Sequence, residues 1–320
     1  MNIADLTGQA YPAQTERAAT FVSRVMEESP LLRALMNFVW RATEHKYRPA
    51  AGGQTLNPRG LGGSFTASDL TPGQLQSGML AIAGFILHYD EAYEKDHELG
   101  LGIDMDSWLD QELAERAVDT AEDIETRLLS GDGTNDDIKG LLEILDGETD
   151  LPGLGITGVI DGGETQDTDY LDLTDENKFS EFLELFEKWK QELREAGILI
   201  TNRSMAAKLT TIARKFHQYS WDRDAFGERI EMIDGIPIVR VIDEAMPLAD
   251  GVGDIILAAN REGHWNIGSN SGLAFWDVGE LPTEKMSRAV KFEVRAKHEI
   301  RTKRAIRRIE NIRVQPAAAE

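Results

Sequence analysis

The spacing of a glutamate and a histidine in Glu94-Lys-Asp-His97 is the feature of this sequence closest to a metal-binding motif. Di-iron proteins built as helical bundles use Glu-x-x-His twice, together with two further carboxylates on other helices. The motif occurs once here, and the six histidines form no pair at metal-ligand spacing. We therefore expect the histidines to have surface or packing roles.

A second group of carboxylates, Asp132, Asp136 and Asp137, lies in a glycine-rich turn. Calcium binds carboxylate and carbonyl oxygens, but the Asp-x-Asp-x-Asp-Gly spacing of a calcium loop is absent. Gly131 and Gly133 favour instead a solvated turn in which both glycines adopt positive φ. We interpret Gly131, Asp132 and Gly133 as a structural elbow that ends one element and leads into the next.

Sequence motifs of common enzyme classes are missing. No phosphate-binding Gly-x-x-x-x-Gly-Lys loop, no Gly-x-Ser-x-Gly elbow and no His-Glu-x-x-His pair occurs. The sequence has no cysteine, which excludes disulfides, thiolate metal sites and cysteine nucleophiles. We therefore expect a chain that is not an enzyme, with no catalytic residue, no metal site and no cofactor.

Charge is distributed unevenly along the 320 residues, whose formal net charge is −22. Residues 81–190 contain 31 acidic and 7 basic residues, whereas residues 283–314 contain 11 basic and 4 acidic ones. The basic residues alternate with apolar ones, which favours the solvent face of a sheet over a polyanion-binding site. The acidic middle argues against a protein that reads DNA sequence, because phosphate neutralisation dominates the affinity of such proteins.

Neither a secretory signal nor a membrane span is expected from the sequence. The N-terminus lacks a basic region followed by an apolar stretch. The longest apolar run, 79–87, is far shorter than the roughly 20 residues of a membrane span. We expect a soluble chain that is made in a reducing compartment and has no membrane partner.

Residues 105–129 are predicted to form an unusually long amphipathic helix. Asp104 and Asp106 can cap its start, and Gly131 can end it. At about 1.5 Å per residue, such a helix spans on the order of 35 Å. Its apolar stripe has the three- and four-residue spacing of a one-sided helix: Met105, Leu109, Leu113, Ala117, Ala121, Ile124 and Leu128.

The segments before this helix show little periodicity. Residues 1–28 are expected to form an arm that gains order only against a partner. A short helix is predicted from Pro30 to near His45, and the glycines and prolines of residues 46–78 predict an extended loop after it. The apolar residues 79–87 then favour a hairpin that returns to a sheet.

The segments after the elbow predict an α/β arrangement. Thr174 can cap a helix that Gly197 ends, and Asn202 can cap the next helix. The pair Asp234-Gly235 has the composition of a two-residue hairpin turn between strands.

The last part of the sequence is predicted to be rich in strands. One strand shows strict alternation, with one face expected to be buried (Val290, Phe292, Val294, Ala296, Ile300) and the other wet (Lys291, Glu293, Arg295, Lys297, Glu299). A short helix is expected at 302–309, followed by a strand at 312–314.

Three of these features together resemble one known family. The long helix ending in Ser130-Gly-Asp-Gly-Thr134, the stretch Asp234-Gly-Ile-Pro-Ile-Val239 and the closing alternating strand are similar, in this order, to the major capsid proteins of tailed double-stranded DNA phages. Encapsulins, which are cellular compartments that load enzymes, share this fold. The resemblance covers nearly the whole chain and implies an α+β fold of the Hong Kong 97-like capsid type.

The resemblance also implies a division of the chain. An N-terminal arm would cover residues 1–45, and an extended β-hairpin loop residues 46–80. A peripheral domain would comprise residues 81–147 and 255–320, including the spine helix 105–129, and an axial α/β domain residues 148–254. In the family the hairpin reaches over the neighbouring subunit, so the expected assembly contacts are Arg48, Arg59, Gly60, Gly62 and Gly63.

The implied function is that of a major capsid protein. Copies would assemble as hexamers and pentamers into an icosahedral shell around the DNA of a tailed phage. The chain would be located in the virion after assembly in the bacterial cytoplasm. Its partners would be further copies of itself, a portal protein at one vertex, DNA enclosed without sequence recognition, and, as an open option, a decoration protein.

Two properties of some family members are not expected here. Some members join subunits by an isopeptide bond between a hairpin lysine and an asparagine of the neighbour. Residues 48–78 contain no lysine, and Lys46 stands only at the base of the loop, so we expect no self-crosslinking. Other members begin with a cleavable scaffolding segment. The loop begins near residue 46, which favours a separate scaffolding protein.

Two alternatives stay open from the sequence. The chain could form an encapsulin shell of the same fold, or it could be a soluble α/β enzyme whose acidic turns bind a divalent metal. Nucleic acid inside purified particles favours the phage capsid, and enzyme cargo favours the encapsulin. A small oligomer with bound metal favours the enzyme.

Overall fold

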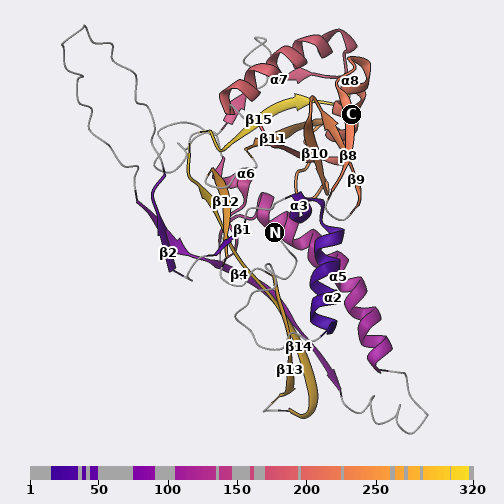
Figure 1. Ribbon diagram of the computed structural model, residues 1–320, viewed down its shortest axis with the longest axis vertical. Helices are drawn as coiled ribbons and strands as arrows, with labels where there is room; N and C mark the ends of the chain where they lie inside the picture. The colour runs from indigo at the N-terminus through magenta and orange to yellow at the C-terminus, as the bar shows by residue number, and fades with distance from the viewer. Residues whose placement is uncertain are drawn as a thin grey trace, which may run out of the picture.

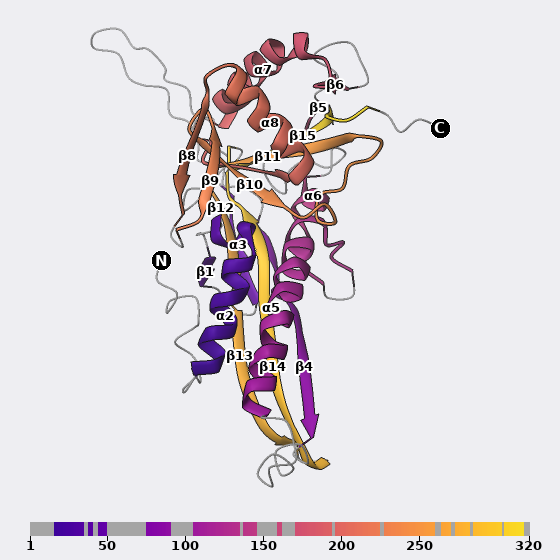
Figure 2. The same cartoon turned by 90° about the vertical axis from the view of Figure 1, so that its right-hand side faces the viewer.

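The computed structural model describes residues 16–34, 38–40, 44–49, 75–90, 105–134, 137–145, 159–161, 170–193, 196–224, 227–259, 264–269, 273–281, 284–302 and 304–316. These residues form an elongated α+β molecule in which a helical layer and a long sheet extend from a second, broader sheet (Figures 1 and 2). The described helices are α2 (Glu16–Glu28), α3 (Pro30–Ala34), α5 (Met105–Ser130), α6 (Leu141–Ile144), the 3-10 helix η2 (Glu176–Lys178), α7 (Phe179–Leu193) and α8 (Arg203–Lys215).

The strands form three sheets. A five-stranded sheet has the order β1 (Phe38–Trp40), β12 (Trp265–Ser269), β14 (Glu284–Ile300) and β13 (Leu273–Leu281), with β4 (Ala81–Asp90) also paired to β14. An eight-stranded sheet has the order β5 (Val159–Asp161), β15 (Ile306–Arg313), β11 (Val252–Ala258), β7 (Ile198–Asn202), β10 (Ile236–Val241), β9 (Arg229–Ile233) and β8 (Tyr219–Arg223), with β6 (Leu171–Asp172) also paired to β15. The third sheet is the pair β2 (Glu44–Tyr47) and β3 (Gln76–Met79).

The predicted long helix is confirmed as α5, and its apolar stripe is buried. From Leu109 to Leu128 the expected positions are buried in one continuous core, which also contains residues of both large sheets. The same core includes Ile198, Ile200 and Ile256 from one face of the eight-stranded sheet. Residues that alternate with these, such as Leu199, belong to a second core under α7 and α8. The eight-stranded sheet is therefore buried on both faces, which explains the uninterrupted burial of β7.

The prediction of an N-terminal arm without a partner in its own chain is wrong for residues 16–28. These residues form α2, which lies along α5 and buries Phe21, Val22 and Val25. The ring of Phe21 meets Phe292 edge-on at 5.5 Å and Phe85 at 6.2 Å. The prediction failed because α2 is rich in charged residues at its exposed positions, and its apolar residues with helical spacing were overlooked. Residues 1–15 lie outside the described residues.

Two further helix predictions need correction. The helix expected to reach His45 ends at Ala34, and residues 38–40 form β1, parallel to β12. The helix expected at 302–309 is replaced by β15, a strand between β11 and the pair β5 and β6. Ile306 and Ile309 have helical spacing, but β15 is buried from both sides, so the apolar period of a half-exposed strand is lost.

Several local predictions are confirmed. The side chain of Asn202 caps α8 by accepting a hydrogen bond from Met205 N at 2.8 Å. Asp234 and Gly235 both adopt positive φ in the two-residue turn between β9 and β10. The cap before α7 is different, because Asp175 rather than Thr174 accepts from the backbone at the start of η2.

The alternation of β14 is confirmed for its apolar face but fails on the face expected to be wet. Glu293 and Glu299 are buried. Glu293 is bonded by Lys291, at 2.8 Å, and by Arg295, and Glu299 is bonded by Arg301 at 2.8 Å. These neighbours two residues away neutralise carboxylates that the polar pattern alone would place in water.

His298 connects β14 to the end of α5. Its Nε2 donates to the carbonyl of Leu128 at 2.9 Å, and its Nδ1 accepts from Trp265 Nε1 at 3.2 Å. The last carbonyls of a helix have no partner within the helix, so this bond satisfies one of them. Complete burial disfavours the charged imidazolium and lowers the pKa of His298 to about 4.

We predict that His298 makes the fold sensitive to acid. Because the unfolded chain protonates this imidazole near pH 6.5 and the folded chain near pH 4, the free energy of unfolding should fall by about 3 kcal/mol between pH 7 and pH 4 through this residue. This contribution is fully present above pH 6.5. Urea titrations of wild type and His298→Gln, at both pH values and on unassembled chain, measure the difference. Equal losses of stability in the two proteins would contradict the prediction.

Candidate assembly surfaces

The predicted elbow is a closed turn after α5. Gly131 N bonds to Arg127 O at 3.2 Å, and Gly140 N bonds to Gly131 O at 2.7 Å. Asp132 Oδ1 accepts from Thr134 N at 2.8 Å, and these bonds from Thr134 lower the pKa of the Asp132 carboxyl. Residues 132 and 139 form an isolated antiparallel bridge, so the chain reverses and enters α6.

The two glycines of the elbow are needed for different reasons. Gly133 has φ of 69°, as expected. Gly131 does not have positive φ, so that prediction is wrong. A Cβ at Gly131 would lie 2.2 Å from Ile138 O and 2.5 Å from Arg127 O, because the two strands of the turn touch there. The requirement at Gly131 is close backbone approach rather than a left-handed conformation.

Two carboxylates of this turn, Asp132 and Asp137, already accept hydrogen bonds from other side chains of the same chain. Asp137 Oδ1 accepts from Arg127 Nη1 at 2.6 Å, and Asp132 is bound by Thr134. Glu94, His97 and Asp136 lie outside the described residues. Among the residues that the structure describes, no group of three His, Asp or Glu side chains could hold a metal ion. Over the same residues, no helix combines the length and the hydrophobicity of a membrane span.

A buried carboxylate on α5 joins three parts of the molecule. Glu125 is 2% exposed and accepts from Ser29 Oγ at 2.7 Å and from Leu31 N at 3.1 Å. It also accepts from the backbone of Ile242, which follows β10. Burial raises the pKa of Glu125, while these three donors oppose the shift. Sequence reasoning missed this residue, because its donors lie about a hundred residues away in both directions.

The base of the predicted hairpin loop is formed by β2 and β3. Residues 44–47 pair with residues 76–79 in antiparallel register. Tyr47 fixes this base to the body, because Arg301 covers its ring at 5.6 Å. Burial is the main cause that raises the pKa of the Tyr47 hydroxyl, and the nearby Glu299 adds to it. Arg48 is exposed at the end of β2. The other predicted assembly contacts, Arg59, Gly60, Gly62 and Gly63, lie outside the described residues.

An exposed apolar row runs from the hairpin base into β4. Its members are Leu75, Met79, Ile82 and Ile86, and the last three are 68%, 49% and 53% exposed. These four are half of the large apolar side chains that are exposed in the described part of the chain. Among the described strands, β4 is hydrogen-bonded to β14 alone. An edge strand with such side chains is usually covered by another chain.

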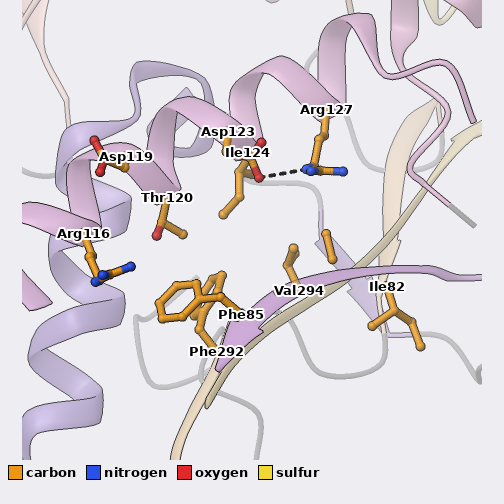
Figure 3. Close-up of a pocket in the computed structure, with 12 residues that line it drawn as sticks. Ile82, Phe85, Arg116, Asp119, Thr120, Asp123, Ile124, Arg127, Phe292 and Val294 are labelled. Carbon is orange, nitrogen blue, oxygen red and sulfur yellow. Dashed lines mark hydrogen bonds and ion pairs between the residues drawn. The ribbon is translucent and has the colours of Figure 1, made fainter. Parts of the chain in front are cut away.

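A groove separates the same strand from α5. It has a volume of about 430 Å³ and lies between charged side chains of the helix and aromatic side chains of the strands (Figure 3). The strands contribute Phe85 and Phe292, which stack at 5.6 Å. The helix contributes the pair Asp123 and Arg127, joined at 2.8 Å. Gly84 allows β4 to approach β14 closely, since a Cβ there would lie 2.2 Å from Phe292 O.

This chain matches one family by its sequence and several known shell proteins by its fold. The model of the phage capsid family matches residues 9–273. No curated protein matches the sequence. The structure is similar to the capsid of a native GTA particle, with a TM-score of 0.58 and 16% identity over 90% of this chain and 90% of that one.

Two other solved structures show the same likeness. The SrpI encapsulin of Synechococcus elongatus PCC 7942 matches with a TM-score of 0.56 and 12% identity over 100% of this chain and 98% of that one. The virus-like particle of Pyrococcus furiosus matches with a TM-score of 0.54 and 13% identity over 92% and 98%. At these identities the structural matches establish the shared fold.

We predict that the elbow depends on the absence of a side chain at Gly131. Gly131→Ala should lower the free energy of unfolding by about 2 kcal/mol or more, because the new Cβ meets two backbone carbonyls. Gly227→Ala is the matched control, since Gly227 has φ of 87° and nothing lies within 4 Å of the position that its Cβ would take. It should cost only about 1 kcal/mol of backbone strain. Equal losses in denaturant titrations would contradict the contact explanation.

Proposed function

The chain belongs to the phage capsid family and is a capsid shell protein, and from this premise we propose that it assembles as hexamers and pentamers into an icosahedral shell around double-stranded DNA. The observation that carries the proposal is the exposed apolar row of Leu75, Met79, Ile82 and Ile86 beside the hairpin base. Such side chains gain stability only when another chain covers them. The proposed role is structural, without catalysis.

We also propose how the parts of the chain divide this work. The hairpin loop 46–80 and residues 1–15 would contact neighbouring copies. A peripheral domain would contain α5 and the five-stranded sheet, and an axial domain the eight-stranded sheet. Because β11 and β15 pair within the eight-stranded sheet, residues 255–258 and 306–313 of the expected peripheral segment 255–320 would belong to the axial domain.

Further partners form part of the proposal. Assembly in the bacterial cytoplasm would involve a separate scaffolding protein and a portal protein at one vertex, with a decoration protein as an optional addition. The enclosed DNA would be held without sequence recognition. An encapsulin remains the competing shell, and its likeness to this chain extends to the fold. The contents of purified particles separate the two, because nucleic acid supports the capsid and enzyme cargo the encapsulin.

Electron microscopy of the purified chain tests the proposed function. We expect ring-shaped capsomers or closed shells, formed with or without a co-expressed scaffolding protein. On denaturing electrophoresis the particles should give a monomer band, because residues 48–78 contain no lysine for a covalent crosslink. A ladder of covalent multimers would contradict the second expectation. A chain that stays monomeric at every concentration would overturn the function.

The apolar row gives a second prediction. Ile82→Thr combined with Ile86→Thr should raise the concentration needed for assembly at least tenfold, since burying each isoleucine contributes roughly 1.5–3 kcal/mol. Threonine keeps the β-branched shape that suits a strand, so the unfolding midpoint should stay close to that of wild type. Val118→Thr, at an exposed position of α5, is the control. Light scattering against concentration measures the effect, and unchanged assembly of the double variant would exclude this row as an interface.

A further inference from the structure

The short helix α3 lies where the long helices meet the eight-stranded sheet (Figures 1 and 2). It follows α2 after the single residue Ser29, and it packs against β10. Leu31 and Leu32 are buried in the core that α5 shares with this sheet. Helix α3 therefore joins the part of the molecule that is built on α5 to the eight-stranded sheet.

The N-terminal end of α3 is bonded to α5. Ser29 Oγ donates to Glu125 Oε1 at 2.7 Å and accepts from Leu32 N at 3.1 Å. Leu31 N donates to the same carboxylate oxygen at 3.1 Å, and the backbone of Ile242 donates to this carboxylate as well. One buried carboxylate thus holds together the start of α3, helix α5 and the residue that follows β10.

The C-terminal end of α3 is bonded to the turn between β8 and β9. Arg33 Nη1 lies 3.2 Å from Asp224 Oδ2, and the two side chains are 16% and 7% exposed. Asp224 is held by its own turn, because its Oδ1 accepts from Glu228 N at 2.8 Å and its carbonyl accepts from Gly227 N at 3.0 Å. A carboxylate that is fixed in this way gives the bond from Arg33 a defined direction.

The space between α3 and the sheet is incompletely filled. A cavity of about 280 Å³ lies between α3 and the strands β9 and β10, with Pro30, Ala34 and Ile238 in its wall. A closely packed contact resists rotation, whereas open space permits it. The angle between α3 and this sheet therefore depends on the directional contacts at the two ends of the helix.

The ion pair of Arg33 and Asp224 supplies direction more than stability. Apolar side chains often replace a buried ion pair without loss of stability, because both charges lose their hydration on burial. Arg33 Nε is also buried and has no hydrogen-bond partner in the described part of the chain, which is unfavourable for folding. An apolar contact would avoid both penalties but would not fix a direction between α3 and the turn.

We propose that α3 is a brace that fixes the angle between α5 and the eight-stranded sheet, with Ser29, Arg33 and Asp224 as its positioning residues. In a shell, the shape of one copy sets the rotation between neighbouring copies, and this rotation decides how the surface closes. The brace therefore sets the curvature of the shell and, through it, the diameter. This last step rests on the proposed shell function, whereas the angle is a property of the single chain.

Distance measurements on the unassembled chain test the angle. Because the sequence has no cysteine, Glu115→Cys on α5 and Lys188→Cys on α7 place one spin label on each part. The pair variant, Arg33→Met with Asp224→Asn, removes both charges, while the asparagine oxygen still accepts from Glu228 N. In this variant the distribution of distances between the labels, measured by electron paramagnetic resonance, should be about twofold broader than in the labelled wild type.

Three further variants separate direction from general stability. Arg33→Lys keeps a positive charge beside Asp224 and should retain the narrow distribution. Ser29→Ala loosens the other end of the brace and should broaden the distribution, so the test does not depend on one variant. Lys178→Met with Glu181→Gln removes an exposed ion pair, joined at 3.0 Å at the start of α7, and should change nothing. Circular dichroism confirms that each variant is folded.

Electron microscopy of assembled particles tests the curvature. Wild type and Arg33→Lys should form shells of one main diameter, whereas the diameters of the pair variant should spread about twofold more widely. A narrow distance distribution in both the pair variant and Ser29→Ala would overturn the brace. If distances broaden while shell diameters match those of wild type, the link to curvature is wrong and the shell function stands. If wild type forms no shells, the proposed function fails, and the distance measurement still decides the brace.

Discussion

The position of α5 is the constraint on which the described structure depends. Two buried side chains hold it in place. Glu125, on α5, accepts a hydrogen bond from Leu31 N at the start of α3. His298, on β14, donates a hydrogen bond to Leu128 O near the end of α5. Leu31 N and Leu128 O belong to helix ends, where the helix itself supplies no partner. An unpaired polar group there would cost about 1–3 kcal/mol. These directional hydrogen bonds therefore fix the rotation of α5 about its axis and its position along that axis, in addition to the burial of its apolar stripe.

This arrangement makes one core serve both sheets. The apolar stripe of α5 belongs to a single core that also includes residues of the five-stranded and of the eight-stranded sheet. The Gly131 elbow then returns the chain at once, so α6 packs against the same core. Assembly surfaces can then lie at sheet edges, as the exposed side chains of Ile82 and Ile86 on β4 do.

The sequence predicted the parts of this structure that are governed by local rules. The stripe of α5, the Asn202 cap and the Asp234-Gly235 turn depend on residues close together in the chain, and all are confirmed. The errors arose where distant residues decide. Ile306 and Ile309 show helical spacing, yet they belong to strand β15, which pairs with β11 on one side and β5 on the other. Glu293 has the sequence pattern of a solvated residue, but its paired cations allow it to be buried.

Some candidate surfaces could likewise be predicted from local sequence, whereas others are formed by residues distant in the chain. The apolar residues 79–87 and the hairpin base follow from a sequence pattern. The bonds of Glu231 with Arg214, Tyr219 and Arg240 do not, because these residues come from α8, β8, β9 and β10 and meet only after folding. The five contacts expected from the resemblance remain predictions, and four of them, Arg59, Gly60, Gly62 and Gly63, lie outside the described residues.

The exposed face of α5 is acidic. Its exposed positions include Asp110, Glu115, Asp119, Glu122 and Asp123, and its two arginines are each bonded to a carboxylate of the same helix. Binding to DNA requires cations that replace the counterions of phosphates, and this helix offers none that is not already paired within it. An acidic surface of this kind would repel the phosphates of the DNA that we propose the shell encloses.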